Sequence, residues 1–271
     1  MSFLSSITQF LPSFDRLRGQ PQPAAPFTTP TYEDVCRARA LLKALHLPTE
    51  LVLDILDYAS YWPTYTLKSS FDRIQATAPR AALCLEVGVF NNPTVNSIRA
   101  SGERFKIRAV QFDIISNDQG WVSSNNLAHT YDTYSWLEVS ILRNETNRSI
   151  HIPDLGLMDP LVCNPLGFHR HMAGRGCFLV SRPEDAFQGP QDGEGDLAWY
   201  LQGNRVTASR QRYHVVWAED GSGGNSEGAG TGKGFLQALT DGDRILVWAR
   251  AKYPGWECIV KRLTVTVCYG F

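Results

Sequence analysis

Cysteine and long apolar runs are scarce in this sequence. Its six cysteines are scattered over 271 residues and no Cys-x-x-Cys spacing occurs, which excludes the disulfide framework of a small secreted domain. The sequence contains no run of about 18 apolar residues, so it predicts no membrane-spanning helix. The first residues also lack the basic region and unbroken apolar core of a secretory signal. We therefore expect reduced thiols, no membrane span, and a cytoplasmic or nuclear location.

An excess of charge of one sign is also absent. The formal net charge is -1, from 26 Lys and Arg against 27 Asp and Glu. This balance gives no electrostatic reason to expect nucleic acid or an anionic membrane as the main partner. The sequence has no Gly-x-Ser-x-Gly, His-Glu-x-x-His or paired-carboxylate motif. It therefore favours a protein that is not an enzyme.

A glycine-rich stretch resembles a phosphate-binding loop but fails on spacing. Residues 228–234 read GAGTGKG, yet Glu227 stands where the first glycine is needed. Gly234 replaces the Ser or Thr that binds Mg²⁺, and no helix clearly follows. A flexible hairpin insert over residues 219–234 explains the composition more simply. We expect no nucleotide cofactor.

Two histidines lie near two cysteines, which are the ligand types of zinc sites. His169 and His171 are flanked by Cys163 and Cys177, with the spacing Cys-x5-His-x-His-x5-Cys. No common structural zinc site uses this spacing, and a thiol at the start of an apolar strand can simply pack. We expect loop histidines and no metal.

The chain begins with two segments that precede the main pattern. Residues 1–18 place apolar side chains at three- and four-residue spacing, which predicts a helix with one apolar stripe that Pro12 would bend. Residues 19–31 are rich in proline and predict an extended linker. Docking on the protein's own surface, partner binding and membrane-surface anchoring all fit this N-terminal amphipathic segment.

Residues 32–62 are the strongly helical part of the remaining sequence. A first apolar stripe runs from Val35 to Leu45, and negative charge is placed early, where a helix N-terminus favours it. Pro48 then predicts the first turn of a second helix. We assign residues 32–80 to a short helical segment and the rest of the chain to a separate domain.

From about residue 81 to the end, the hydrophobic period changes to two. Predicted strands cover residues 82–90, 105–115, 135–142, 177–181, 196–203, 205–209, 213–218, 244–251 and 258–269. Turns rich in Gly, Asn, Asp and Pro separate them, and no long helix intervenes. Residues 81–271 therefore predict a mainly β fold, an antiparallel β-sandwich or jelly roll of the galactose-binding-like type.

Strand alternation also predicts which side chains share a face. Leu83 should share a face with Leu85, Val87 and Val89, and Ile259 with Leu263, Val265 and Val267. In the segment 244–251, one face should carry Ile245, Val247 and Ala249, and the other Leu246, Trp248 and Arg250.

Aromatic residues and hydrogen-bonding side chains in the β region indicate a binding role. Sugars and peptides are commonly held by aromatic faces together with a few amide, Arg or His groups. Tryptophan on a strand is more often part of the core, whereas turns present residues to ligands. The predicted ligand-binding residues are Trp121, Asn204, Arg205, Arg210, His214, Arg250, Tyr253 and Trp256. A hydrolase with a scattered site near His214, with Ser209 as its neighbour, stays an alternative.

Residues 45–60, LHLPTELVLDILDYAS, resemble the first half of an F-box. The resemblance implies a partner, the Skp1-type adaptor of a ubiquitin ligase, and a set of residues that would dock on it: Leu47, Pro48, Leu51, Ile55 and Leu56. The second half of an F-box is not evident, because Trp62 and Pro63 interrupt the pattern. Two helices packed as a lid on the sandwich would produce much of the same pattern.

Most of residues 45–271 resembles a family of uncharacterised fungal proteins. In that family LPxELVxxILDxAxYW precedes a β domain ending in GDRIxxWARAxxPGW. The matches are residues 47–62, 118–121, 204–205, 214–217 and 242–256. We therefore predict a non-enzymatic intracellular recognition protein with a protein partner and a peptide or glycan ligand, in the manner of an F-box adaptor. A structural or regulatory β-sandwich whose helices belong to its own fold stays the alternative.

Overall fold

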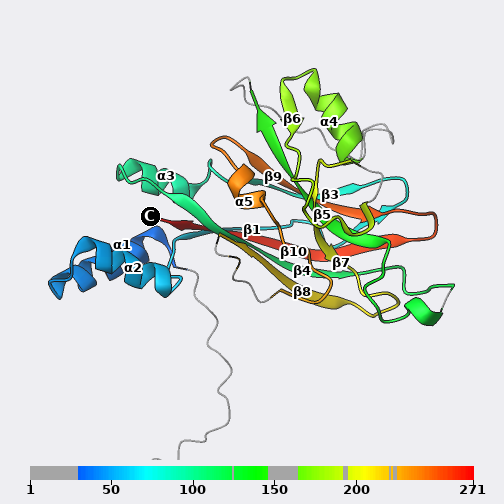
Figure 1. The fold of residues 1–271 in the computed structure, drawn as a ribbon, viewed down its shortest axis with the longest axis horizontal. Helices are drawn as coiled ribbons and strands as arrows, with labels where there is room; N and C mark the ends of the chain where they lie inside the picture. The colour runs from blue at the N-terminus through cyan, green and yellow to red at the C-terminus, as the bar shows by residue number, and fades with distance from the viewer. Residues whose placement is uncertain (1–29, 124, 146–163, 192–194, 220, 222–224) are drawn as a thin grey trace, which may run out of the picture.

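The computed structural model describes residues 30–123, 125–145, 164–191, 195–219, 221 and 225–271. The helix predicted for residues 1–18, and the linker up to residue 29, lie outside them. Two antiparallel sheets of five strands pack face to face (Figure 1). The prediction of a mainly β, antiparallel β-sandwich is confirmed. No helix within the described ranges is long and apolar enough to cross a membrane.

Sheet A is built around the last strand of the chain. Its strands are β1 (Thr64–Lys68), β2 (Ile74–Thr77), β4 (Lys106–Asn117), β8 (Gln211–Ala218) and β10 (Glu257–Gly270). β10 pairs with β1 and β2 along one side and with β4 along the other, and β4 pairs with β8.

Sheet B is built around β5 and β9. Its strands are β3 (Ala82–Gly88), β5 (Ser135–Asn144), β6 (Cys177–Leu179), β7 (Trp199–Gly203) and β9 (Arg244–Ala251). The α-helices are α1 (Tyr32–Ala44), α2 (Thr49–Tyr58), α3 (Pro93–Ala100), α4 (Pro165–Ala173) and α5 (Phe235–Ala238). Figure 1 shows α1, α2 and α3 near the C-terminus, and α4 beside sheet B.

The helical segment predicted for residues 32–80 is too long. Residues 64–68 and 74–77 are strands of sheet A, paired with β10. Tyr65 and Leu67 alternate with polar neighbours and pack against the main core, so the period-two pattern already begins before residue 81. Pro48 precedes the second helix rather than occupying its first turn.

The strand predicted for residues 205–209 is wrong. The backbone N–H of Val206 donates to the carbonyl of Thr130, and that of Thr207 donates to the Asp118 carboxylate. Thr207 also has a φ of 55°, which an extended strand does not allow. Both N–H groups bond to residues of other loops instead of a neighbouring strand, so the segment forms a turn that links these loops.

The hydrophobic pattern does not predict the two short helices α3 and α4, but a local sequence signal marks where each begins. Asn92 and Asn164 cap α3 and α4, each accepting a hydrogen bond from a first-turn backbone N–H, at 3.1 and 2.7 Å. A proline follows each asparagine at the first helical position. Asn-Pro is a favourable start for a helix, because the cap accepts an orphan donor and proline fixes φ.

The main core lies between the sheets, and β-bulges alter two of the predicted faces. The three residues predicted to share one face of β9, Ile245, Val247 and Ala249, are all in this core. A bulge in β3 turns Cys84 into the core and leaves Leu83 against a second cluster outside sheet B. A bulge in β10 aligns Val260, rather than Ile259, with Leu263.

The α1–α2 hairpin packs on the sandwich. Val52 and Leu56 are buried in a small cluster that Phe271, the last residue, joins. The Arg39 guanidinium lies 4.1 Å from the centre of the Phe271 ring and donates to Glu103 at 2.7 Å. The hairpin is therefore part of the fold, as the lid interpretation predicts, and only its outer face is open to a partner.

The glycine-rich segment is packed over residues 225–234, rather than forming a free insert there. A Cβ on Gly230 would overlap the backbone carbonyl of Tyr200, and one on Gly232 would overlap the Trp217 ring. Gly230 N donates to a carbonyl of β7 at 2.9 Å. The glycines are needed because the chain runs directly over other backbone and rings.

Candidate functional site

Four aromatic side chains gather where β4, β5, β9 and β10 meet their loops. Tyr134 packs edge-on against Tyr253 and Trp256, at centroid distances of 4.8 and 5.4 Å. Trp121 lies over Gly255, so near that a Cβ there would be 3.4 Å from the ring. Trp121 is 59% exposed and Tyr253 46% exposed. We call these four rings, Trp121, Tyr134, Tyr253 and Trp256, the aromatic end.

A buried carboxylate holds the loop that carries Trp121. Asp118 accepts hydrogen bonds from the backbone N–H of Gly120 at 2.9 Å and of Thr207 at 2.7 Å. Burial raises the pKa of the Asp118 carboxyl, although both N–H groups act to lower it. Gln119 Nε2 donates to the Trp121 carbonyl at 2.7 Å. The Trp121 ring is therefore presented from a braced loop.

Asn204 is a structural residue, and its prediction as a ligand contact is wrong. It is fully buried. Its Oδ1 accepts from Ser116 Oγ at 2.6 Å, and its Nδ2 donates to Ser135 Oγ at 2.8 Å and to Cys258 Sγ at 3.4 Å. The side chain joins the two sheets behind the aromatic end. Burial raises the pKa of the Cys258 thiol to about 11.

Neither Arg205 nor Arg210 makes its contacts with the four rings of the aromatic end. Arg205 Nε donates to the His129 carbonyl at 2.9 Å, and its backbone N–H donates to Tyr213 Oη at 2.9 Å. Arg205 therefore fastens a loop. Arg210 is exposed and lines a groove on the outer face of sheet A.

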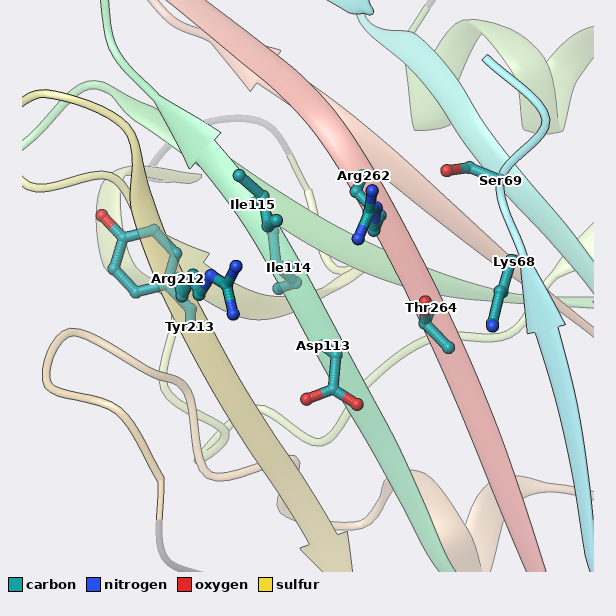
Figure 2. Close-up of a pocket in the computed structure, with 9 residues that line it drawn as sticks. All are labelled: Lys68, Ser69, Asp113, Ile114, Ile115, Arg212, Tyr213, Arg262 and Thr264. Atoms are coloured by element: carbon teal, nitrogen blue, oxygen red, sulfur yellow. The ribbon is translucent and has the colours of Figure 1, made fainter. Parts of the chain in front are cut away.

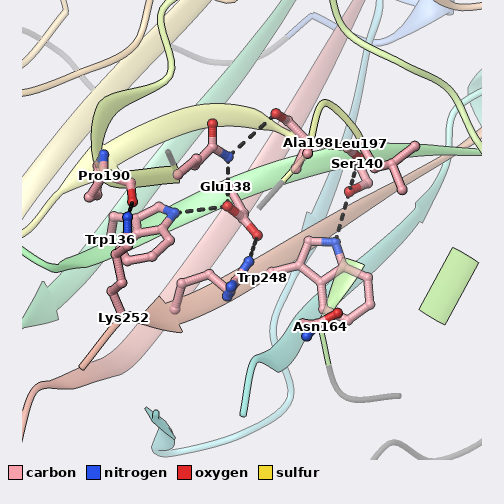
Figure 3. A network of polar contacts seen from close by, with 12 residues as sticks. Trp136, Glu138, Ser140, Asn164, Pro190, Leu197, Ala198, Trp248 and Lys252 are labelled. Atoms are coloured by element: carbon pink, nitrogen blue, oxygen red, sulfur yellow. Dashed lines mark hydrogen bonds and ion pairs between the residues drawn. The ribbon is translucent and has the colours of Figure 1, made fainter. Parts of the chain in front are cut away.

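Arg250 is 5% exposed and cannot contact a ligand at the aromatic end, so its prediction as a ligand contact is also wrong. It forms an ion pair with Glu138 beneath the loops that cover sheet B. Glu138 also accepts from Trp136 Nε1 at 2.8 Å and Gln191 Nε2 at 2.6 Å (Figure 3). The guanidinium lies 5.2 Å from the centre of the Trp136 ring. Alternation correctly predicts that Arg250 and Val247 lie on opposite faces of β9. The outer face of sheet B, however, is covered.

His214 forms half of the arrangement that a hydrolase would need. Its Nδ1 lies 2.8 Å from Asp113 Oδ1, and both side chains are on the outer face of sheet A. Among the described residues, no Ser, Thr or Cys side chain bonds to the imidazole, and Ser209 accepts only from Gln211 through its carbonyl. The pair alone supplies no nucleophile.

The histidines near the cysteines lie on a helix rather than in a loop. His169 and His171 are in α4, and His169 Nδ1 accepts the backbone N–H of Leu179 at 3.0 Å. Cys177 is buried at the start of β6, whereas Cys163 lies outside the described residues. Within the described part of the chain, no group of three or more His, Cys, Asp or Glu side chains could hold a metal.

The residues of the F-box resemblance divide between a buried and an exposed face. Leu56 is buried against the sandwich, and Leu47 packs at the edge of the same cluster. Pro48 is exposed, as are Leu51 at 44% and Ile55 at 37%. Leu56 therefore supports the hairpin, and Leu51 and Ile55 are available to a partner.

Sequence reasoning missed further surface residues that the fold brings together. Tyr134, the centre of the aromatic end, precedes β5 in a polar stretch and carries no periodic signal. Lys68, Arg212 and Arg262 line one groove on sheet A (Figure 2). The alternation of β10 places Arg262 on its outer face, but only strand register adds the other two.

Comparisons with known proteins find no family model that matches the chain. No curated protein matches it either. Among solved structures, peanut lectin with a 9mer peptide is 9% identical and matches at a TM-score of 0.32, covering 77% of this chain and 99% of that chain. An infectious bursal disease virus Gx strain is 11% identical at a TM-score of 0.14, covering 77% of this chain and 41% of that chain. Both likenesses are too distant to say what this chain binds.

Proposed function

We propose that this protein is a non-enzymatic intracellular recognition protein that binds a partner through α1–α2 and a peptide or glycan through the aromatic end. The observation that supports this proposal is the location of the large apolar side chains that are exposed. Five of the eight in the described residues lie on the hairpin: Leu41, Leu45, Leu51, Ile55 and Tyr58. Two more, Trp121 and Tyr253, lie at the aromatic end.

The exposed face of the hairpin is suited to another protein. Clustered apolar side chains exposed to water mark interaction surfaces, and amphipathic helices commonly bind through such a face. The buried face, with Val52 and Leu56, fixes both helices, so the outer face is preorganised. Because Leu51 and Ile55 belong to the F-box resemblance, the proposed partner is a Skp1-type adaptor.

Replacing Leu51 or Ile55 with aspartate is expected to abolish capture of a purified Skp1-type adaptor in a pull-down. A charge in the middle of an apolar interface costs at least about 2 kcal/mol, which is roughly thirtyfold in affinity. The matched control is Ser97→Asp on the exposed side of α3, which should leave capture unchanged. The adaptor proposal would be contradicted if both the parent protein and the control failed to capture the adaptor.

The aromatic end and the hairpin lie at opposite ends of β10, whose first residue is Glu257 and whose last is Gly270 (Figure 1). Fourteen strand residues place them roughly 45 Å apart. A protein with this layout can hold a ligand at one end and a partner at the other. Exposed indole and phenol faces stack on sugar rings and on peptide side chains.

Trp121→Ala is expected to weaken binding of a ligand at the aromatic end by tenfold or more, since it removes the most exposed of the four rings there. The probes are neutral oligomers of glucose, mannose, galactose and N-acetylglucosamine and a Pro-rich peptide, titrated by calorimetry. Tyr58→Ala, which removes an exposed ring at the opposite end, is the control. A ligand that binds Trp121→Ala as well as the parent protein would rule out this surface.

A further inference from the structure

The outer face of sheet A carries an open groove (Figure 2). It has two adjoining parts with volumes of about 560 and about 460 Å³. Both parts are lined by Ser69, Ile115 and Arg262, so they form one continuous surface. Because β1, β10, β4 and β8 supply its floor, the groove crosses the strands on a rigid sheet.

Strand register sets the cationic side chains of the groove in rows. Thr264 pairs with Lys68 on one side and Asp113 on the other. Ile115 pairs with Arg262 on β10 and Arg212 on β8. Neighbouring strands are about 4.8 Å apart, so the Cα atoms of the two arginines are about 10 Å apart across Ile115. Two guanidinium groups therefore flank an aliphatic floor.

Positive charge exceeds negative charge in the groove. Its cationic side chains are Lys68, Arg210, Arg212, Lys261 and Arg262. Its carboxylates are Asp72 and Asp113, and Asp113 lies 2.8 Å from His214 Nδ1. None of the ion pairs among the described residues includes one of the five cations. The groove therefore attracts an anionic ligand.

We propose that this groove binds an extended acidic peptide segment of a partner protein, with carboxylates held by Arg212 and Arg262. A guanidinium group matches a carboxylate with two parallel hydrogen bonds, which a point charge does not provide. Ile115 offers an apolar floor between them, and the hydroxyls of Ser69 and Thr264 can bond to a peptide backbone. The site goes beyond the proposed function and needs neither the hairpin nor the aromatic end.

The lining of the groove favours a peptide over a single-stranded nucleic acid. Single-stranded nucleic acids usually bind where rings are open for stacking. The aromatic residues that line this groove are Tyr213, which is buried, and Phe71, which packs against the main core. Tyr213 is thus unavailable for stacking and Phe71 is only partly exposed, whereas the guanidinium groups and hydroxyls suit carboxylates and backbone amides.

The test uses the full chain and a fluorescein-labelled hexaglutamate peptide, measured by fluorescence anisotropy at low and at physiological salt. Binding is expected, and should weaken as salt rises. Arg212→Gln and Arg262→Gln should each weaken it roughly tenfold, since each loses a charge-assisted contact. Arg170→Gln, an exposed arginine of α4, is the matched control and should bind like the parent protein. A hexaglutamine peptide should not bind.

Three outcomes would overturn the proposal. Hexaglutamate that fails to bind is one, and hexaglutamate that binds Arg262→Gln as tightly as Arg170→Gln is another. The third is binding of heparin or oligothymidine, through the same arginines, more tightly than the acidic peptide. Leu51→Asp should still bind hexaglutamate, so failure of the hairpin proposal can be told apart from failure of this one.

Discussion

Replacing Arg250 with leucine is expected to lower the free energy of unfolding by about 3–5 kcal/mol. The substitution leaves the Glu138 carboxylate buried without its cationic partner. Trp136 and Gln191 still donate to it at 2.8 and 2.6 Å, but two neutral donors do not replace a charge. Urea unfolding monitored by circular dichroism measures the change as a lower midpoint at an unaltered slope.

Two variants separate the buried pair from a general effect of losing arginine. Arg99→Leu removes a surface ion pair with Asp241 and should cost no more than about 1 kcal/mol. Arg250→Leu combined with Glu138→Leu should recover most of the loss, because apolar groups tolerate this environment better than a single charge. Equal losses for Arg250→Leu and Arg99→Leu would refute the interpretation of a buried, tightly held pair.

Gly230→Ala is expected to destabilise the protein by at least about 3 kcal/mol. The added Cβ would overlap the backbone carbonyl of Tyr200, and backbone cannot rotate aside as a flexible side chain can. The hydrogen bond from Gly230 N to the Leu201 carbonyl, at 2.9 Å, would be strained at the same time. Thermal unfolding should show a markedly lower Tm, with loss of near-ultraviolet signal from neighbouring rings.

Gly174→Ala is the matched control for this substitution. Gly174 follows α4 with a φ of -64°, and no atom lies within 4 Å of an added Cβ. Alanine there should be neutral or stabilising by about 0.5 kcal/mol, because it restricts the unfolded chain without strain. If Gly230→Ala were as stable as Gly174→Ala, the segment would have to be a flexible insert after all.

Three rings of the aromatic end could be predicted from the sequence. Which of the predicted polar residues are exposed could not. The sequence predicts Trp121, Tyr253 and Trp256 because aromatic faces commonly hold ligands and turns present residues to them. Asn204 and Arg250 have the same hydrogen-bonding chemistry and are buried, one between the sheets and one beneath the loops of sheet B. A polar residue type does not reveal whether a distant segment covers it.

The sequence by itself determined the fold class, the α1–α2 hairpin, most strand positions and the face that each strand residue occupies between bulges. These features depend on hydrophobic period, which is local. Only the tertiary structure decided which outer face is open. Loops cover that of sheet B and bury Arg250, while sheet A keeps a groove whose cations, Lys68, Arg212 and Arg262, come from strands far apart in the chain. Strand register alone brings such residues together, because hydrogen bonding between strands ignores their distance along the chain.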